Sequence, residues 1–165
     1  MTVKVEKIPY GGWNNCYRIS NDTVEVVVTS DVGPRIIRYG FIGRFNVMCE
    51  KEDQMGKSGG DEWMIYGGHR LWHSPEHEIR SYYPDNFPVD VQIIENGIKV
   101  SQPVEKTTMI KKDIEVVLDD ESSKVYLKHT LTNYNLWDVE LAAWALTVVA
   151  PGGLEVVPQE TLDTK

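Results

Sequence analysis

The sequence predicts an all-β protein made of antiparallel strands, with a single β-sandwich domain over residues 1–165. Three observations lead to this prediction. Apolar residues alternate with polar ones at period two in successive short segments, and no segment shows the spacing of a long amphipathic helix. Turn-forming residues separate these segments at short intervals, as in sandwiches and barrels. A length of 165 residues suits one domain with its own core.

The first predicted strands lie in the N-terminal third of the chain. In Thr23–Ser30, three valines (Val24, Val26 and Val28) fall on one face of an extended segment. Arg35–Tyr39 follows a Gly-Pro turn and is also short and β-rich.

The later strands come in hairpins. Val89–Ile94 and Gly97–Ser101 flank Asn96-Gly97, a dipeptide that supplies the positive φ of a tight turn. Thr108–Leu118 and Lys124–Thr132 flank a polar turn. Trp137–Val149 is a long β-rich run, and Leu154–Val157 is a last short strand.

One region departs from this pattern. Lys51–Asp61 is polar and glycine-rich, which predicts a mobile loop. It leads into Gly67–Glu78 (GGHRLWHSPEHE), the most chemically dense stretch of the chain. Within it, Ser74 is a plausible helix N-cap, because Pro75 and Glu76 suit the first turn of a helix.

Composition excludes several classes of function. The net charge is −8, and lysine and arginine form no stripe, so nucleic acid is not an expected partner. No stretch approaches the roughly 18 apolar residues of a membrane span, and the N-terminus lacks the apolar region of a signal peptide. Cys16 and Cys49 are too few for a disulfide framework and suit buried free thiols. We therefore expect a cytoplasmic protein with no membrane partner.

The dense stretch predicts the functional site. It holds three of the four histidines of the chain, together with an arginine, a tryptophan and carboxylates. Proton carriers, a fixed cation and aromatic faces in one segment are what a ligand pocket needs. The alternative is that alternating residues pack a strand while histidine and arginine brace the loops. The candidate catalytic residues are His73, His69 and Glu76, and the candidate substrate-binding residues are Arg70, Trp72, His77, Tyr66 and Asn86.

The three histidines of the stretch recur every four residues, and on one helix they would share a face suited to zinc. Pro75 disfavours such a helix, so we expect no metal and no cofactor. Three other residues are expected in the core. They are His129, hydrogen-bonded on an apolar face, and the tryptophans Trp137 and Trp144.

Three motifs together resemble those of the galactose mutarotase-like (aldose 1-epimerase-like) superfamily. They are the Gly-Pro-Arg turn in Asp31–Ile37, the strand that ends in His129–Asn133, and GGHRLWHSPE, which is similar to a signature of one bacterial branch. The resemblance covers most of the chain and implies an antiparallel β-supersandwich with a sugar cleft on its concave sheet. In such enzymes a histidine acid and a glutamate base act on the sugar, while an arginine and aromatic residues hold it.

The resemblance also shows two departures. Trp144 lies near the position where these mutarotases carry the histidine that follows the Thr-Asn turn, and their base glutamate lies late in a chain about twice as long. The chain therefore resembles the N-terminal portion of a longer, here incomplete, supersandwich, and we expect a homodimer or a C-terminal partner chain. Three functions stay open: a carbohydrate-binding domain with a small-molecule sugar at Gly67–Glu78, an aldose 1-epimerase or related sugar isomerase, and a non-catalytic structural half.

Overall fold

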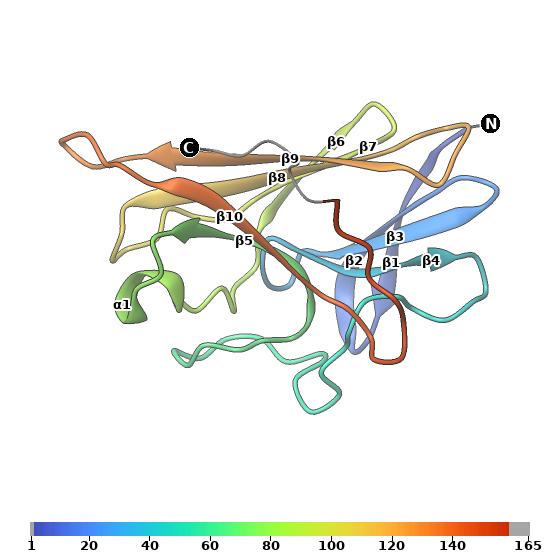
Figure 1. Cartoon of the computed structure of the whole chain (residues 1–165), viewed down its shortest axis with the longest axis horizontal. Coiled ribbons are helices and arrows are strands. Elements are labelled where there is room, and N and C mark those ends of the chain that lie inside the picture. Colours follow the sequence, from blue (N-terminus) through green and yellow to red (C-terminus); the bar gives the residue numbers. More distant parts are fainter. Residues whose placement is uncertain (1, 159–165) are drawn as a thin grey trace.

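The computed structural model describes residues 2–158 and consists of two antiparallel β-sheets that face each other, so the predicted all-β sandwich is confirmed (Figure 1). Its elements are β1 (Lys4–Tyr10), β2 (Trp13–Ser20), β3 (Val24–Thr29), β4 (Arg35–Phe41), β5 (Gly68–Ser74), α1 (Glu78–Ser81), β6 (Asp90–Ile94), β7 (Gly97–Ser101), β8 (Ile110–Leu118), β9 (Val125–Asn133) and β10 (Ala142–Val148).

The larger sheet has six strands in the order β1-β2-β3-β4-β5-β10, and the smaller has four in the order β6-β7-β8-β9. Strands β1 to β4 follow one another as neighbours, and β5 joins them after a long connection over residues 42–67. The chain then builds the whole second sheet before β10 returns to pair with β5, placing Trp144 opposite Trp72. Strand β5 therefore lies between two strands that are far from each other in the sequence.

The six-stranded sheet carries an apolar cluster on each of its two faces. The inner face packs against the second sheet through Ile19, Val26, Ile36 and Leu71, which meet Ile98, Ile114 and Val116. The outer face carries a second apolar cluster of Trp13, Cys16, Val27, Val32, Ile37 and Tyr66. Neighbours such as Ile36 and Ile37 face opposite ways because side chains alternate along a strand. The long connection covers the outer cluster, since Met55 and Met64 pack against it.

Most of the predicted strands agree with the structure within two residues. The valines Val24, Val26 and Val28 share the inner face as expected, and Asn96 has a φ of 55° in the predicted tight turn. The long run Trp137–Val149 is strand only over Ala142–Val148, and Leu154–Val157 is not a strand, so these two expectations were wrong. Strands β1 and β2 had not been identified, and β5 corresponds to the strand that the sequence offered as the alternative interpretation of the dense stretch.

Two further expectations need correction. The N-cap of α1 is His77 rather than Ser74, because Ser74 still belongs to β5 and pairs with Ala142. Trp137 is 70% exposed rather than in the core, because it lies in the connection between β9 and β10 and not on a strand. Trp144 is half-buried, on the outer side of its sheet.

The two cysteines are free thiols, with Cys16 buried and Cys49 half-buried. Burial raises the pKa of the Cys16 thiol to about 11. In residues 2–158, no helix is long and apolar enough to cross a bilayer.

Candidate functional site

The two glycines that open the dense stretch have a structural reason. Gly67 and Gly68 have φ values of 108° and 66°, which disfavour residues with a side chain. A Cβ on Gly68 would also overlap the carbonyl oxygen of Ile36, and one on Gly67 would overlap that of Cys49. Glycine at both positions allows the chain to turn sharply and enter the sheet beside β4 as strand β5.

Because Gly68–Ser74 is a strand, its side chains alternate between two environments. His69, Leu71 and His73 face the second sheet, as the place of Leu71 in the inner core shows. Arg70 and Trp72 face the outer side. The structure therefore divides the predicted site residues into an outer group and an inner group, with β5 between them.

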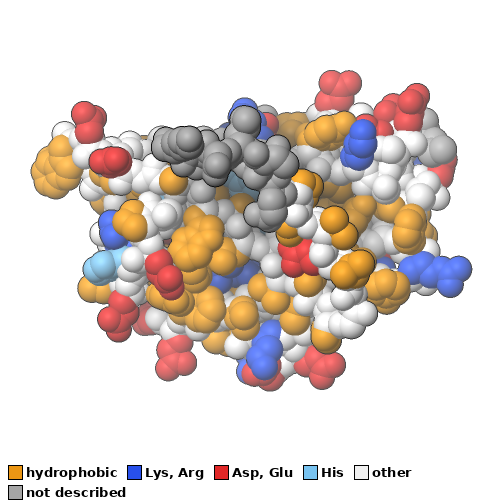
Figure 2. All heavy atoms as spheres, in the orientation of Figure 1, with side chains coloured by type: hydrophobic (Ala, Val, Ile, Leu, Met, Phe, Trp, Pro, Cys, Tyr) orange, Lys and Arg blue, Asp and Glu red, His pale blue; other side chains and the backbone are white. Residues whose placement is uncertain are grey.

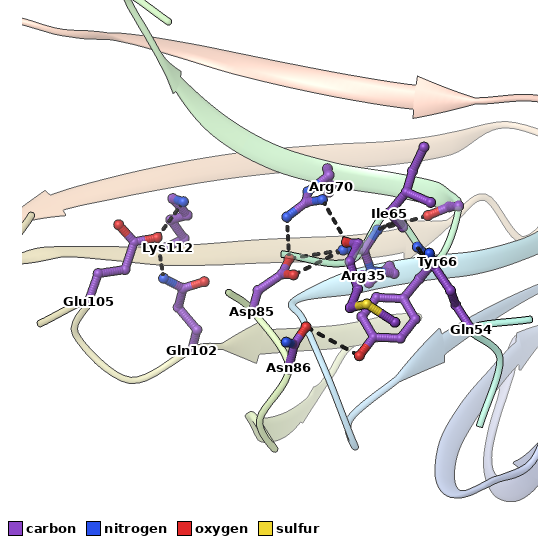
Figure 3. A network of polar contacts seen from close by, with 12 residues as sticks. Arg35, Gln54, Ile65, Tyr66, Arg70, Asp85, Asn86, Gln102, Glu105 and Lys112 are labelled. Atoms are coloured by element: carbon purple, nitrogen blue, oxygen red, sulfur yellow. Dashed lines mark hydrogen bonds and ion pairs between the residues drawn. The ribbon is translucent and has the colours of Figure 1, made fainter. Parts of the chain in front are cut away.

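The outer group is organised around a buried pair of arginines. Arg35 of β4 and Arg70 of β5 lie directly opposite each other on neighbouring strands. Both residues are buried, with exposed fractions of 0% for Arg35 and 5% for Arg70. Two like charges in this arrangement repel. Asp85, from the loop after α1, lies between them. It accepts hydrogen bonds from Arg35 Nη2 at 3.0 Å and from Arg70 Nη2 at 2.9 Å (Figure 3).

The pKa values of this group follow from burial and charge. Burial raises the pKa of Asp85, but Arg70 and Arg35 outweigh it, so this pKa lies below its usual value of 3.8. Burial lowers the pKa of Arg70 to about 10; Asp85 opposes the shift and the neighbouring Arg35 adds to it. Asp85 thus provides one negative charge for the two positive charges of Arg35 and Arg70, so this trio of side chains carries a net positive charge.

Tyr66 and Asn86 hold the covering loop rather than line a cavity. Both are buried, and the Tyr66 hydroxyl donates to Asn86 Oδ1 at 3.2 Å (Figure 3). The Asn86 amide nitrogen donates to the backbone oxygens of Gly60 and Glu62. The guanidinium carbon of Arg35 lies 5.1 Å from the centre of the Tyr66 ring. These contacts fix the segment that carries Trp63 over the outer face of β5.

Four aromatic rings form a continuous cluster on that face. Trp72 contacts Tyr82, Trp144 and Trp63 at centroid distances of 5.1, 5.3 and 6.0 Å. Trp63 and Tyr82 also contact each other edge to face, 5.3 Å apart. Trp72 is buried beneath the other three rings, which are half-buried or exposed. We call Trp63, Trp72, Tyr82 and Trp144 the aromatic cluster.

The aromatic cluster adjoins the arginine pair. The guanidinium carbon of Arg70 lies 5.1 Å from the centre of the Trp72 ring and 5.3 Å from that of Trp63, both within cation–π range. Figure 2 shows hydrophobic side chains gathered over the part of the surface where Figure 1 places β5, β10 and α1, with acidic side chains beside them.

The inner group is a pair of hydrogen-bonded histidines that joins the sheets. His69 Nε2 lies 2.8 Å from Nε2 of His129 on β9, and His69 Nδ1 lies 2.8 Å from Oγ1 of Thr147 on β10. The hydrogen bond expected at His129 is therefore confirmed, whereas the side chain is half-buried rather than part of the core. Burial, followed by the proximity of His129, lowers the pKa of His69 to about 4, and burial lowers that of His129.

His73 lies further along the same inner face. Burial and the nearby charge of Lys112 lower its pKa, and Nε2 has no hydrogen-bond partner among the described residues. Lys112 pairs with the buried Glu105, which also accepts from Gln102 Nε2 at 3.0 Å (Figure 3). His73 is thus a neutral side chain beside a compensated ion pair.

The last two predicted residues are on the surface. Glu76 is exposed and accepts a hydrogen bond of 2.5 Å from the Tyr82 hydroxyl, which raises the pKa of Tyr82. His77 is exposed and caps α1 through Nδ1. Within residues 2–158, no three histidine, cysteine or acidic side chains are grouped so that they could hold a metal ion.

Comparisons with protein-family models, curated proteins and solved structures found no match to this chain.

Several residues of the site had not been predicted. Asp85 and Arg35 were outside the candidate set, as were Trp63, Tyr82 and Trp144. A signal for Arg35 does exist in the sequence, because the predicted strand Arg35–Tyr39 begins with a charged residue in an apolar segment. For Asp85 the signal is weaker, since it is one of several polar residues in a turn.

Proposed function

We propose that the chain is a carbohydrate-binding domain of the galactose mutarotase-like type, and that the sugar lies on the outer face of the six-stranded sheet. The observation that carries the proposal is the aromatic cluster, in which Tyr82 and Trp144 reach the surface beside the buried Arg70. Aromatic faces attract polarised C–H groups such as those of a sugar ring. The exposed carboxylate of Glu76, next to Tyr82, provides an acceptor for sugar hydroxyls.

The two-sided arrangement of β5 favours binding without turnover. An aldose 1-epimerase needs a proton donor at the ring oxygen and a proton acceptor at the anomeric hydroxyl, both within reach of the same bound sugar. His69 and His73 face the interior, while Arg70 and Trp72 face the aromatic cluster. A sugar held by the aromatic cluster would therefore lie on the opposite side of the strand from both histidines. The isomerase stays the second candidate because His73 is neutral and has a free Nε2.

The test is a titration with galactose and glucose followed by calorimetry and tryptophan fluorescence. We expect Trp144→Ala and Tyr82→Ala each to weaken binding roughly fivefold, the equivalent of about 1 kcal/mol for one aromatic contact. Trp137→Ala is the matched control, because Trp137 is exposed and makes no ring contact within the described residues. An unchanged affinity in all three variants would refute the placement of the sugar.

The same protein separates the three functions. Exchange NMR of the glucose and galactose anomers detects an isomerase as faster interconversion that His73→Ala removes. Binding with unchanged interconversion supports the carbohydrate-binding domain. Absence of any sugar binding by the wild-type chain would support the structural interpretation and overturn the proposal.

A further inference from the structure

We propose that the sugar recognised by this chain is anionic, and that its carboxylate or phosphate group binds to N–H donors of Arg70, Trp63 and Trp72. This inference rests on the proposed function and specifies the class of sugar. It begins from the hydrogen-bonding state of the aromatic cluster. Within the described residues, Arg70 Nε, Trp63 Nε1 and Trp72 Nε1 are all buried without a hydrogen-bond partner.

These three groups share one chemical character. Each is a hydrogen-bond donor only, because neither an indole N–H nor a guanidinium N–H can accept a hydrogen bond. Each buried donor without a partner costs about 1–3 kcal/mol. The three belong to side chains in mutual contact, since the Arg70 guanidinium lies 5.3 Å from the Trp63 ring and 5.1 Å from the Trp72 ring. A ligand rich in acceptor oxygens would satisfy such donors.

Among the described residues, the indole nitrogens that are buried without a partner are those of Trp63 and Trp72. Trp13 is also buried, in the second apolar cluster, but its Nε1 donates to the backbone oxygen of Lys57 at 2.8 Å. Trp144 belongs to the aromatic cluster, but its Nε1 is not among the buried atoms without partners. The fold therefore provides an acceptor for a buried indole elsewhere, while the two indoles that contact the Arg70 guanidinium have none among the described residues.

The charge balance favours an anion over a neutral acceptor. Arg35 and Arg70 share the single carboxylate of Asp85, so the trio carries a net charge of about +1. The carboxylate of Glu105 is already paired with Lys112, so it provides no free negative charge to compensate the trio. Burial of an uncompensated charge is unfavourable, and an anionic ligand beside Arg70 would relieve it.

The side chain that can open a path is Tyr82. It is 38% exposed, covers Trp72, and is held on the surface by the hydrogen bond from its hydroxyl to Glu76. Trp63 is held more firmly than Tyr82, because Asn86 binds the backbone of its loop on either side of Asp61. Rotation of the Tyr82 ring would uncover the Trp63 and Trp72 rings that it contacts and would give a ligand a path to the donors beside them.

The test compares galacturonate, glucose 6-phosphate, galactose and inorganic phosphate by calorimetry at low ionic strength. We expect at least one anionic sugar to bind roughly tenfold more tightly than galactose. Galacturonate alone would identify a carboxylate, and glucose 6-phosphate alone would identify a phosphate. A Trp63→Phe variant keeps a ring but removes one donor, so it should reduce this preference roughly fivefold, the equivalent of about 1 kcal/mol for one hydrogen bond.

The controls use the same kind of substitution. Trp144→Phe should weaken the anionic and the neutral sugar alike, and Trp137→Phe should change neither. Equal affinities for galactose and both anionic sugars would overturn this inference while leaving the proposed function intact. Tight binding of inorganic phosphate with no gain from a sugar would keep the anion site and overturn the proposed function. No binding of any of the four compounds would overturn both.

Discussion

Replacement of Asp85 by asparagine tests the central contact of the outer group. The change keeps the size of the side chain but removes the charge that lies between Arg35 and Arg70. Both guanidinium groups are buried, so water cannot replace the lost charge. Breaking one partner of a buried ion pair costs about 3–5 kcal/mol, because it leaves an uncompensated charge.

The free energy of unfolding of Asp85→Asn, measured by urea denaturation followed by circular dichroism, should fall by this amount. In a chain of this size the corresponding drop in melting temperature is about 10 °C. Glu6→Gln is the matched control, because Glu6 pairs with Arg18 on the surface at the same 2.9 Å as the Asp85–Arg70 pair. An exposed pair contributes only about 0–1 kcal/mol. If Asp85→Asn cost no more than Glu6→Gln, the argument for a net buried charge would fail.

Three other predictions concern stability and assembly. Folding lowers the pKa of His69 from 6.5 to about 4, so His69 gains its proton in the unfolded chain before it does in the folded chain as the pH falls. The free energy of unfolding should therefore drop by up to about 3 kcal/mol between pH 6.5 and pH 4. Urea denaturation across this pH range should show the drop in stability. His129→Gln should make the drop smaller, whereas His77→Gln, at an exposed residue, should leave it unchanged. A wild-type stability that does not change with pH would contradict the interpretation. Gly68→Ala should lower the melting temperature far more than Gly43→Ala, because the two residues have similar φ values of 66° and 69° but only Gly68 lacks room for a Cβ; equal effects in thermal scans would show that backbone conformation alone matters. The homodimer expected from the sequence stays a prediction, which light scattering checks, and Leu136→Lys, at a residue 94% exposed, should shift it toward the monomer if the connection between β9 and β10 takes part.

Local signals in the sequence predicted much of the fold. The hairpin between β6 and β7 was predictable because Asn96-Gly97 determines a turn with little help from the rest of the chain. Similarly, Val24, Val26 and Val28 indicate a buried face whatever strand they pair with. Strand β5 was predicted only as an alternative because its polar side chains resemble a loop, although their alternation with Leu71 follows the period of a strand.

The composition of the site was harder to predict, because it depends on contacts between distant segments. Arg70 pairs with Asp85 and lies opposite Arg35, two residues from different parts of the chain. No local pattern indicates that pairing; it follows from the order of strands β4 and β5. Trp144 reaches Trp72 only because the chain completes the second sheet before it returns with β10. Such contacts follow from topology, which alternation alone does not determine.

The turn at Gly67-Gly68 also constrains how this part of the chain can change during evolution. Substitutions on one side of β5 leave the other side untouched, so the histidine pair and the aromatic cluster can diversify independently. A deletion or insertion of a single residue between Gly68 and His69 acts differently, because it reverses the direction of every side chain that follows. It would turn Arg70 into the interior and His69 toward the surface. Length in this segment should therefore be far less variable than amino-acid identity.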